Sequence, residues 1–253
     1  MNASSRRVGR PRVNPLPRDQ SPREEVVAVA SRMFALHGFA AVKMSEIAAS
    51  SGLRQSSIYY YFNNKEEILA EIVGEVNRLG LERLLQVNSQ GESAGLRLFR
   101  TLRFDAEMLC RLPYDVNEIL RMTALQEERF SRYWSDRQDL NDGVEALVAE
   151  GIAAGEFLEL DARLAALTLL SNDEAVQNWY RPLGTHRLQG DYQPHEIGAF
   201  LATMALQALL ADRRRLPLIR RLADRLDADL DTDLDTDLDE RSAGALLQRP
   251  QQP

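Results

Sequence analysis

Apolar residues recur along this chain at helical spacing, and no stretch keeps the apolar–polar alternation of a β-strand. The pattern therefore predicts an all-α protein. Ser21-Pro22-Arg23-Glu24 predicts the start of the first helix, because Ser caps, Pro suits the first helical position and Glu completes a capping box. Gly38 predicts its end. Further helices are expected at about 44–51, 54–61, 65–88, 93–111, 114–120, 122–154, 161–181 and 194–213. Asn141-Asp142-Gly143 leaves open a break inside the longest of them.

The two ends of the chain differ from its middle in composition. Residues 1–20 hold five Arg and three Pro and cannot pack a core, so a disordered basic arm is expected there. Residues 229–240 repeat Asp-Leu-Asp-Thr, in which Asp forms helices poorly and like charges four residues apart repel. A disordered acidic tail is therefore expected at 223–253.

The net charge of −7 conceals an asymmetry between these ends. Residues 227–240 carry seven Asp and one Glu without any Lys or Arg, whereas residues 1–65 carry ten Lys or Arg and four Asp or Glu. Because a partner responds to the local field rather than to the net charge, the N-terminal quarter favours an anionic partner.

Composition excludes several classes of protein. The chain is 44% hydrophobic and 27% charged, which is typical of a globular protein with one or two domains. It has no secretory signal and no apolar run near the ~20 residues that span a bilayer. The single cysteine, Cys110, fits a reducing cytoplasm and is expected to be a small core residue. The three His lack metal-ligand spacing and no catalytic motif appears, so neither enzyme activity nor a cofactor is expected.

Residues 44–61 carry the pattern of a helix-turn-helix, in which one helix braces a second that enters the major groove of DNA. Small residues at Ala48 and Gly52 stand where the two helices must approach, and Leu53 and Ile58 are apolar where the second helix must pack back. The remaining face offers groups that read base edges or hold phosphates, namely Arg54, Gln55, Ser56, Ser57, Tyr60 and Tyr61. Taken alone, this pattern also fits a small helical hairpin.

Residues from about 22 to 70 resemble the N-terminal domain of the tetracycline-repressor (TetR) family in order and spacing. The matching positions are Gly38-Phe39, Ile47-Ala48, Gly52-Leu53, Ile58-Tyr59, Tyr61-Phe62 and Lys65-Glu66-Glu67-Ile68-Leu69. The resemblance implies a homodimer that binds DNA through this domain. It also implies that the C-terminal helices supply an effector pocket and the dimer interface.

The same resemblance assigns roles to the candidate DNA contacts. It implies that Gln55, Ser56, Ser57 and Tyr60 face the groove, whereas Tyr59 and Tyr61 touch phosphate or the groove edge. It implies a phosphate contact for Lys65 at the start of the next helix, where backbone N–H groups also favour an anion. Of the three tyrosines, Tyr59 is expected to be the one that is partly core.

Two positions depart from the family pattern, which has Thr in place of Lys43 and Ser in place of Arg54, each as a helix cap. A lost cap typically costs ~1 kcal/mol. Either Ser45 or Ser56 caps one residue later, or the two cations add phosphate contacts. Lys43 and Arg54 are therefore candidate DNA contacts.

The basic arm contains Arg6-Arg7-Val8-Gly9-Arg10-Pro11-Arg12, which looks like the core of a minor-groove hook. A generic basic tail that adds affinity without sequence choice fits these residues equally well. The acidic tail likewise has two interpretations: a solubilising segment, or a segment that competes with DNA for the arm.

The middle helices gather aromatic and sulfur residues, which are core residues by default and pocket candidates through the resemblance: Phe104, Met108, Met122, Phe130, Tyr133 and Trp134. Asn178-Trp179-Tyr180-Arg181-Pro182 resembles a segment of family members that control fatty-acid, steroid or aromatic-acid breakdown, several of which respond to acyl-CoA thioesters. Trp179 and Arg181 are therefore further ligand candidates, with Arg181 pairing with a CoA phosphate. Helix-end packing is the alternative for Arg181.

The helices expected at 161–181 and 194–213 are rich in Ala and Leu on more than one face, which fits a four-helix dimer interface. The predicted domains are a helix-turn-helix DNA-binding domain at 21–66 and a helical effector-binding and dimerisation domain at 67–222. The predicted function is a cytoplasmic, ligand-responsive regulator, a repressor that a small-molecule effector releases from a palindromic operator. The alternative is an effector-independent architectural protein or activator.

Overall fold

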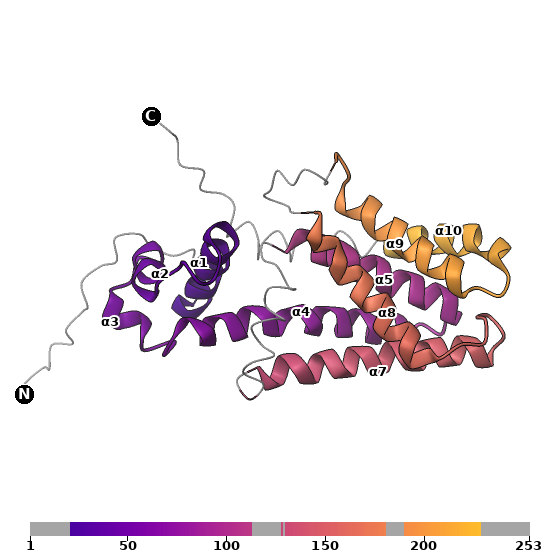
Figure 1. Ribbon diagram of the computed structural model, residues 1–253, viewed down its shortest axis with the longest axis horizontal. Helices are drawn as coiled ribbons and strands as arrows, with labels where there is room; N and C mark the ends of the chain where they lie inside the picture. The colour runs from indigo at the N-terminus through magenta and orange to yellow at the C-terminus, as the bar shows by residue number, and fades with distance from the viewer. Residues whose placement is uncertain (1–20, 113–127, 129, 181–189, 229–253) are drawn as a thin grey trace, which may run out of the picture.

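The computed structural model describes residues 21–112, 128, 130–180 and 190–228, which are mostly helical (Figure 1). Three short helices come first: α1 (Pro22–His37), α2 (Met44–Ser50) and α3 (Gln55–Ile58). The long helix α4 (Lys65–Asn88) leads from them to α5 (Ala94–Arg111), α7 (Ser131–Ala153), α8 (Ala162–Glu174), α9 (Pro194–Leu209) and α10 (Leu216–Asp227). Two 3₁₀ turns, η1 (Ala175–Asn178) and η2 (Arg213–Arg215), follow α8 and precede α10. The all-α prediction is confirmed, while the predicted arm at 1–20, the helix at 114–120 and the tail beyond 228 lie outside the described residues.

Local signals set several helix ends where the sequence predicts them. The Glu24 N–H donates to the Ser21 hydroxyl at 3.3 Å and the Ser21 N–H donates to the Glu24 carboxylate at 2.7 Å, which completes the capping box. The hydrogen bond from the Ser21 backbone N–H to the carboxylate, with a smaller effect from the Ser21 side chain, lowers the pKa of Glu24. At the start of α4 the Asn64 side chain accepts from the Glu67 N–H at 2.9 Å. Gly38 ends α1 with a φ of 77°.

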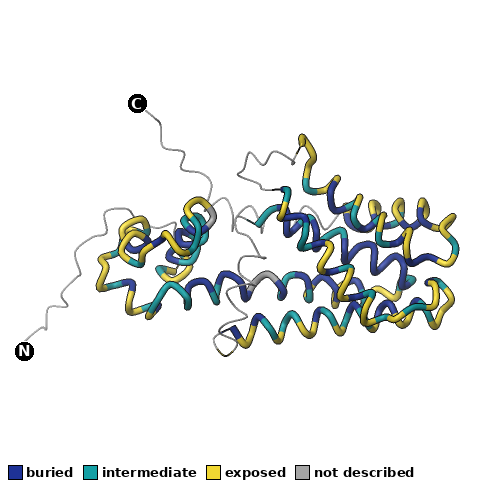
Figure 2. Tube along the Cα trace, in the orientation of Figure 1, coloured by how far each residue is buried: buried dark blue, intermediate teal, exposed yellow. Residues whose placement is uncertain are grey.

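Two apolar cores lie along α4. The first core joins α1, α2 and α3 to the first turns of α4 at Ile68 and Val73. The second core packs α5, α7, α9 and α10 against its far half at Leu84. Figure 1 shows α4 running from one group of helices to the other, and Figure 2 shows buried residues in both parts of this helix. Because 24 helical residues span about 36 Å, α4 is a stiff connection between the two ends of the molecule.

The helical domain departs from the predicted boundaries in three helices. α7 runs unbroken through residues 141–143, where the sequence left a break open. A side chain on Gly143 would lie 2.4 Å from Leu84 Cδ2, so this glycine allows α7 to pack closely on α4 and does not form a turn. α8 ends at Glu174 and passes into η1, and α9 ends at Leu209, both before the predicted ends at 181 and 213.

The predicted boundary between the helical domain and the acidic tail falls inside α10 and moves from 222/223 to the end of that helix. Asp227, which the sequence placed in the acidic tail, is buried. Its carboxylate accepts from Arg83 at 2.6 Å, from Arg100 at 2.7 Å and also from Arg103. The chain's acidic composition concealed this role, because only the fold brings three arginines of α4 and α5 to this residue.

Candidate DNA-binding surface

α2 and α3 meet at a tight turn that fixes one helix against the other. Gly52 has a φ of 64°, a left-handed conformation that favours glycine. The Leu53 N–H donates to the Ala48 carbonyl at 2.9 Å across this turn. Ile47 of α2 and Ile58 of α3 are fully buried in the first core. The geometry is that of a helix-turn-helix braced by α1 and α4.

α3 and the turn after it present a row of polar and aromatic side chains. α3 itself is only four residues long, but the N–H groups of Tyr61 and Phe62 both donate to the Ile58 carbonyl at 3.0 Å, so the chain keeps a helical path. The predicted contacts Arg54, Gln55, Ser56, Tyr59 and Tyr60 are exposed on this path, and Ser57 is half-buried. Lys43, at the start of α2, is also exposed. The structure therefore brings most of the predicted DNA contacts together on one exposed segment.

The three consecutive tyrosines have different surroundings. Tyr60 is 86% exposed and Tyr59 is 48% exposed. Tyr61 packs against the first core, and its ring meets that of Tyr60 edge to face with 5.1 Å between centroids. The expectation that Tyr59 is the partly core tyrosine is therefore corrected to Tyr61. Residues three apart share a helical face, so Tyr61 follows the buried Ile58 inward.

Lys43 and Arg54 occupy the N-cap positions of α2 and α3, and neither side chain forms a cap hydrogen bond. Ser45 and Ser56 lie inside the two helices, so neither takes over as the cap. At α2 the Glu46 carboxylate accepts from the Lys43 N–H at 2.9 Å and satisfies that backbone donor. The two cations consequently stand exposed beside helix N-termini.

Lys65 begins α4 and turns back toward the loop between α1 and α2. Its ammonium donates to the carbonyls of Phe39 at 2.7 Å, Ala40 at 3.2 Å and Val42 at 3.0 Å. It also lies 4.4 Å from the centroid of the Phe39 ring. An ammonium has three donors, so all are used within the protein. The phosphate contact predicted for Lys65 would require breaking at least one of these bonds.

Arg23 connects the DNA-binding helices to α4. Its guanidinium binds the Glu71 carboxylate, with Nε 3.1 Å from Oε1, and Nη1 donates to the Tyr61 carbonyl at 3.0 Å. The same group lies 4.3 Å from the centroid of the Phe62 ring. Arg23 therefore links Glu71 of α4 to the backbone of the tyrosine segment. Sequence reasoning missed this contact, since Arg23 reads only as part of a helix start.

The predicted ligand residues fall into two separate packing groups. Phe130, Tyr133 and Trp134 pack against the first core beside α4. The other group, formed by α5, η1 and α9, contains Phe104, Met108 and Trp179. Arg181 and Met122 lie outside the described residues. The sequence thus identified aromatic residues of the helical domain, but it could not show that they divide between two separate clusters.

Cys110 belongs to the group formed by α5, η1 and α9 and is buried. Burial, with a smaller effect from the nearby Glu107 carboxylate, raises the pKa of its thiol to about 12. The thiolate is the reactive form of cysteine, so this thiol is inert at neutral pH. The prediction of a core cysteine is confirmed.

Two family profiles match this arrangement of domains. "Bacterial regulatory proteins, tetR family" matches residues 26–72, which contain the helix-turn-helix, and "Tetracyclin repressor-like, C-terminal domain" matches residues 119–209. The chain belongs to the TetR family. It is a DNA-binding, ligand-responsive transcriptional regulator, and it acts on operator DNA as a homodimer.

Individual proteins agree with this assignment. The HTH-type transcriptional regulator TtgR of Pseudomonas putida is 25% identical over 183 residues, which cover 69% of this chain and 87% of TtgR. The fatty acid metabolism regulator protein of Bacillus subtilis is 27% identical over 161 residues, covering 61% and 81%. The structure of AibR in complex with isovaleryl coenzyme A and operator DNA shares the fold, with a TM-score of 0.60, 18% identity and coverage of 73% and 97%.

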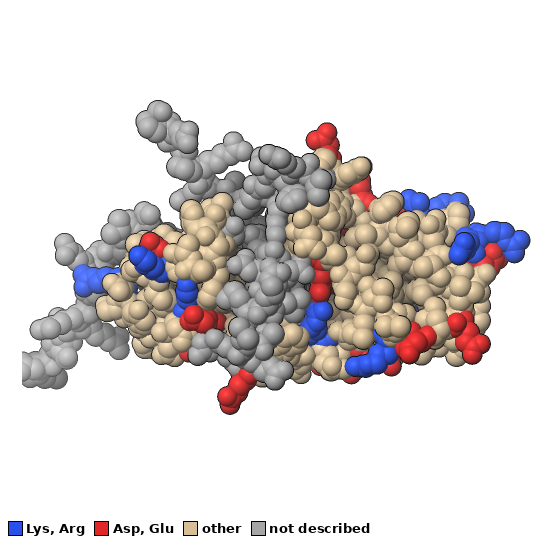
Figure 3. All heavy atoms as spheres, viewed as in Figure 1, with Lys and Arg blue, Asp and Glu red and all other residues tan. Residues whose placement is uncertain are grey.

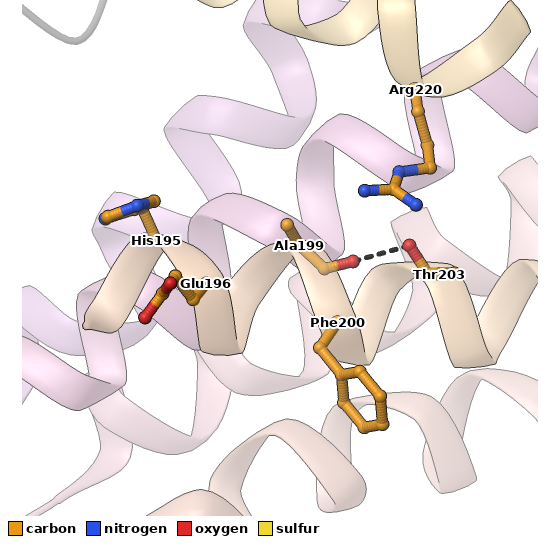
Figure 4. A pocket seen from close by; sticks show the side chains of 6 residues that line it. All are labelled: His195, Glu196, Ala199, Phe200, Thr203 and Arg220. Carbon is orange, nitrogen blue, oxygen red and sulfur yellow. Dashed lines mark hydrogen bonds between the residues drawn. The ribbon is translucent and has the colours of Figure 1, made fainter. Parts of the chain in front are cut away.

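In this TetR-family protein, α8 and α9 leave large apolar side chains in solvent, among them Leu164, Leu167, Phe200 and Met204. A depression of about 380 Å³ beside them is lined by His195, Glu196, Ala199, Phe200, Thr203 and Arg220 (Figure 4). Figure 4 shows the Phe200 ring pointing away from the Arg220 guanidinium, and the Thr203 hydroxyl donating to the Ala199 carbonyl at 2.6 Å. An exposed apolar face of this kind suits burial against a second copy of the chain.

Charge is also distributed unevenly over the TetR-family fold. Lys and Arg side chains appear at the end that carries the helix-turn-helix and again at the opposite end, where η2 and α10 lie (Figure 3). Within the described ranges, no three His, Cys, Asp or Glu side chains are grouped so that they could hold a metal ion. In the same ranges no helix has the length and apolarity needed to cross a membrane.

Proposed function

We propose that this regulator is a repressor that leaves a palindromic operator when a small molecule binds its helical domain. The observation that carries the DNA half of the proposal is the exposed row on α3 and the following turn. It offers guanidinium, amide, hydroxyl and phenol groups to the outside while Ile47 and Ile58 anchor the segment from beneath. A rigidly held short helix with such a face suits the major groove.

Within that row we assign roles by chemistry. Gln55 and Ser56 read base edges, because amides and hydroxyls pair with donors and acceptors in the major groove. Lys43 and Arg54 hold phosphates and supply the part of the affinity that depends on salt. Tyr60 packs on the groove wall, with Ser57, Tyr59 and Tyr61 at its margin. In the homodimer the two recognition helices lie about 35 Å apart on successive major grooves.

The effector acts by changing that separation, and α4 carries the change. Arg23 binds both Glu71 of α4 and the Tyr61 carbonyl, so a shift of α4 moves the recognition segment with it. A ligand drives this shift only through its different affinities for the two states. Crystals of the DNA-bound and ligand-bound protein should differ in the distance between recognition helices, and equal distances would exclude this mechanism.

Acyl-CoA thioesters are the effector class suggested by the relatives. The AibR structure contains isovaleryl coenzyme A, and the matched Bacillus subtilis protein is named for fatty acid metabolism. The matched curated relatives are named as regulators, which supports a protein without enzyme activity. A repressor must reach the chromosome, so we place this protein in the cytoplasm.

The first experiment is genome-wide mapping of binding sites, which supplies the operator for measurements in vitro. Tyr60→Ala should weaken operator binding about tenfold or more, with an unchanged melting temperature because this side chain is 86% exposed. Tyr192→Ala is the matched control, since Tyr192 is 60% exposed and lies beside α9, outside the DNA-binding domain. Equal operator affinities for the two variants would contradict the assigned surface. Operator binding that no compound in an effector screen alters would favour the effector-independent alternative.

A further inference from the structure

A group of polar side chains lies inside the helical domain, where α4, α5, α7 and α8 pack together. Asp105 of α5 and Asp173 of α8 are both buried. Around them α4, α7 and α8 contribute further polar groups, which are Asn77, Tyr133, Arg137 and Glu174. Such a group needs an explanation, because buried carboxyls are normally paired or fully hydrogen-bonded.

The acids of this group outnumber the cations that face them. Arg137 faces Asp105, but its guanidinium is bound by Glu174 through both Nη atoms, with 3.1 Å between Nη2 and Oε2. Among the described residues no basic side chain offsets Asp173, and its Oδ2 makes no hydrogen bond. Burial raises the pKa of Asp105 to about 7, and burial together with Asp105 raises the pKa of Asp173. Among the described residues the two carboxyls thus face one cation, Arg137, which Glu174 already binds.

A second, independent observation comes from Tyr133. Its side chain is 2% exposed and its hydroxyl lies beside Arg137 and Asn77, yet the oxygen has no hydrogen-bond partner of good geometry. The Asn77 amide donates instead to the Tyr133 backbone carbonyl at 3.0 Å. Buried phenols normally find a partner. An unpaired hydroxyl and an unpaired carboxyl oxygen in one interior point to a missing ligand.

We propose that this interior group recognises a cationic effector, an organic ammonium whose charge pairs with Asp105 and Asp173 and whose body lies against Tyr133. The inference rests on the proposed function, because it names the chemical class of the effector that the repressor senses. A cationic effector is the alternative to the acyl-CoA class that the relatives suggest, and the probes below distinguish the two. The site touches α4 directly, since a side chain on Gly80 would lie 3.1 Å from Asp105 Oδ1. A ligand bound there would therefore lie next to α4, the helix that leads to the recognition segment.

Three probes of one shape and three charges test the proposal on the full chain. Benzylamine is a cation, benzyl alcohol is neutral and benzoate is an anion. Benzylamine at millimolar concentration should raise the melting temperature and bind in calorimetry, while the other two should not. Asp173→Asn and Asp105→Asn should each weaken benzylamine binding about tenfold or more, because each removes a carboxyl group whose ionised form pairs with the ammonium. Asp139→Asn, an exposed position on α7, is the matched control and should bind benzylamine like the wild type.

The outcomes separate this inference from the function on which it rests. Circular dichroism should show that both core variants stay folded, since each substitution preserves shape. No stabilisation of the wild type by benzylamine, equal stabilisation by benzoate, or undiminished binding to Asp173→Asn overturns the cationic site. Isovaleryl coenzyme A serves as the anionic rival, and stabilisation by this thioester alone also overturns it. If the wild-type protein still binds its mapped operator in these cases, the repressor assignment stands. If it binds no mapped DNA, the result counts against the repressor assignment itself.

Discussion

At the scale of single residues, lysines that look alike in the sequence have different roles. Lys43 is an exposed N-cap residue whose side chain makes no cap hydrogen bond. Lys65 uses all three donors on carbonyls of the loop between α1 and α2. Only the first is placed to add charge to the DNA surface, so substitutions at the two positions should separate folding from phosphate attraction.

Lys65→Met should destabilise the protein by about 1–3 kcal/mol, because carbonyls of that loop lose their donors. The slope of log affinity against log salt should stay unchanged, since no phosphate contact is removed. Lys43→Met should do the reverse, lowering the magnitude of that slope by about 1 while stability stays the same. Urea unfolding and operator titrations at several salt concentrations measure both quantities. A slope reduced by Lys65→Met would restore the phosphate contact predicted from the family resemblance.

Asp105 makes stability depend on pH in a specific direction. Its pKa is raised from 3.8 to about 7, mainly by burial and then by Glu174, while Arg137 acts in the opposite sense. The folded protein therefore holds this proton more tightly than the unfolded chain does. The stabilisation is complete below the unfolded pKa and is lost as pH rises toward about 7.

Melting temperatures of the wild type should accordingly fall between about pH 4 and pH 7, and Asp105→Asn should flatten that fall, with each pKa unit worth about 1.4 kcal/mol. The groups facing Asp105 are Asp173 and Glu174 of α8 and Arg137 of α7, while α4 presents Gly80. Parallel profiles for wild type and variant would contradict the raised pKa.

At the scale of elements, the sequence predicts helices best where a cap and an apolar stripe coincide. Ser21 and Asn64 begin α1 and α4 as expected, because capping is a local property of a few residues. Three other features depend on contacts between distant segments. These are which of the three tyrosines packs against the core, whether α7 is unbroken, and whether the segment that forms α10 belongs to the helical domain. From the sequence Gly143 indicates a turn, whereas in the structure it lies in a helix packed against Leu84. Similarly, the sequence assigns Asp227 to the acidic tail, whereas in the structure three arginines bind it.

The crossing of α5 and α9 gives an element-scale prediction. A side chain on Gly198 would lie 2.6 Å from the Arg103 carbonyl and 2.7 Å from Glu107 Cγ, so backbone would have to move. Gly198→Ala should therefore destabilise by about 3 kcal/mol despite the better helix propensity of Ala. Gly74→Ala in α4 is the control, because nothing lies within 4 Å of its added carbon. That control should gain up to ~1 kcal/mol, and equal effects in thermal unfolding would refute the close crossing.

At the scale of the whole molecule, one helix joins the DNA-binding end to the larger helical domain, and a buried ion cluster fixes its far half. Arg83 of α4 and Arg100 and Arg103 of α5 converge on Asp227 at the end of α10. α10 is thereby part of the support of α4 and not the beginning of the acidic tail. Any test of the tail must therefore spare Asp227.

Asp227→Asn should destabilise the protein by about 3–5 kcal/mol, because it leaves buried guanidinium groups without their shared carboxylate. Asp224→Asn is the matched control on the same helix, since its side chain is 67% exposed and, among the described residues, its one ion pair is with Arg103. A chain ending at Ala228 should unfold like the full chain, whereas one ending at Leu222 should show the larger loss. Because α4 extends from this cluster to the recognition segment, Asp227→Asn should also weaken operator binding at temperatures below its melting point. Urea unfolding of the four proteins decides the matter, and an Asp227→Asn variant as stable as Asp224→Asn would show that the cluster does not support the domain.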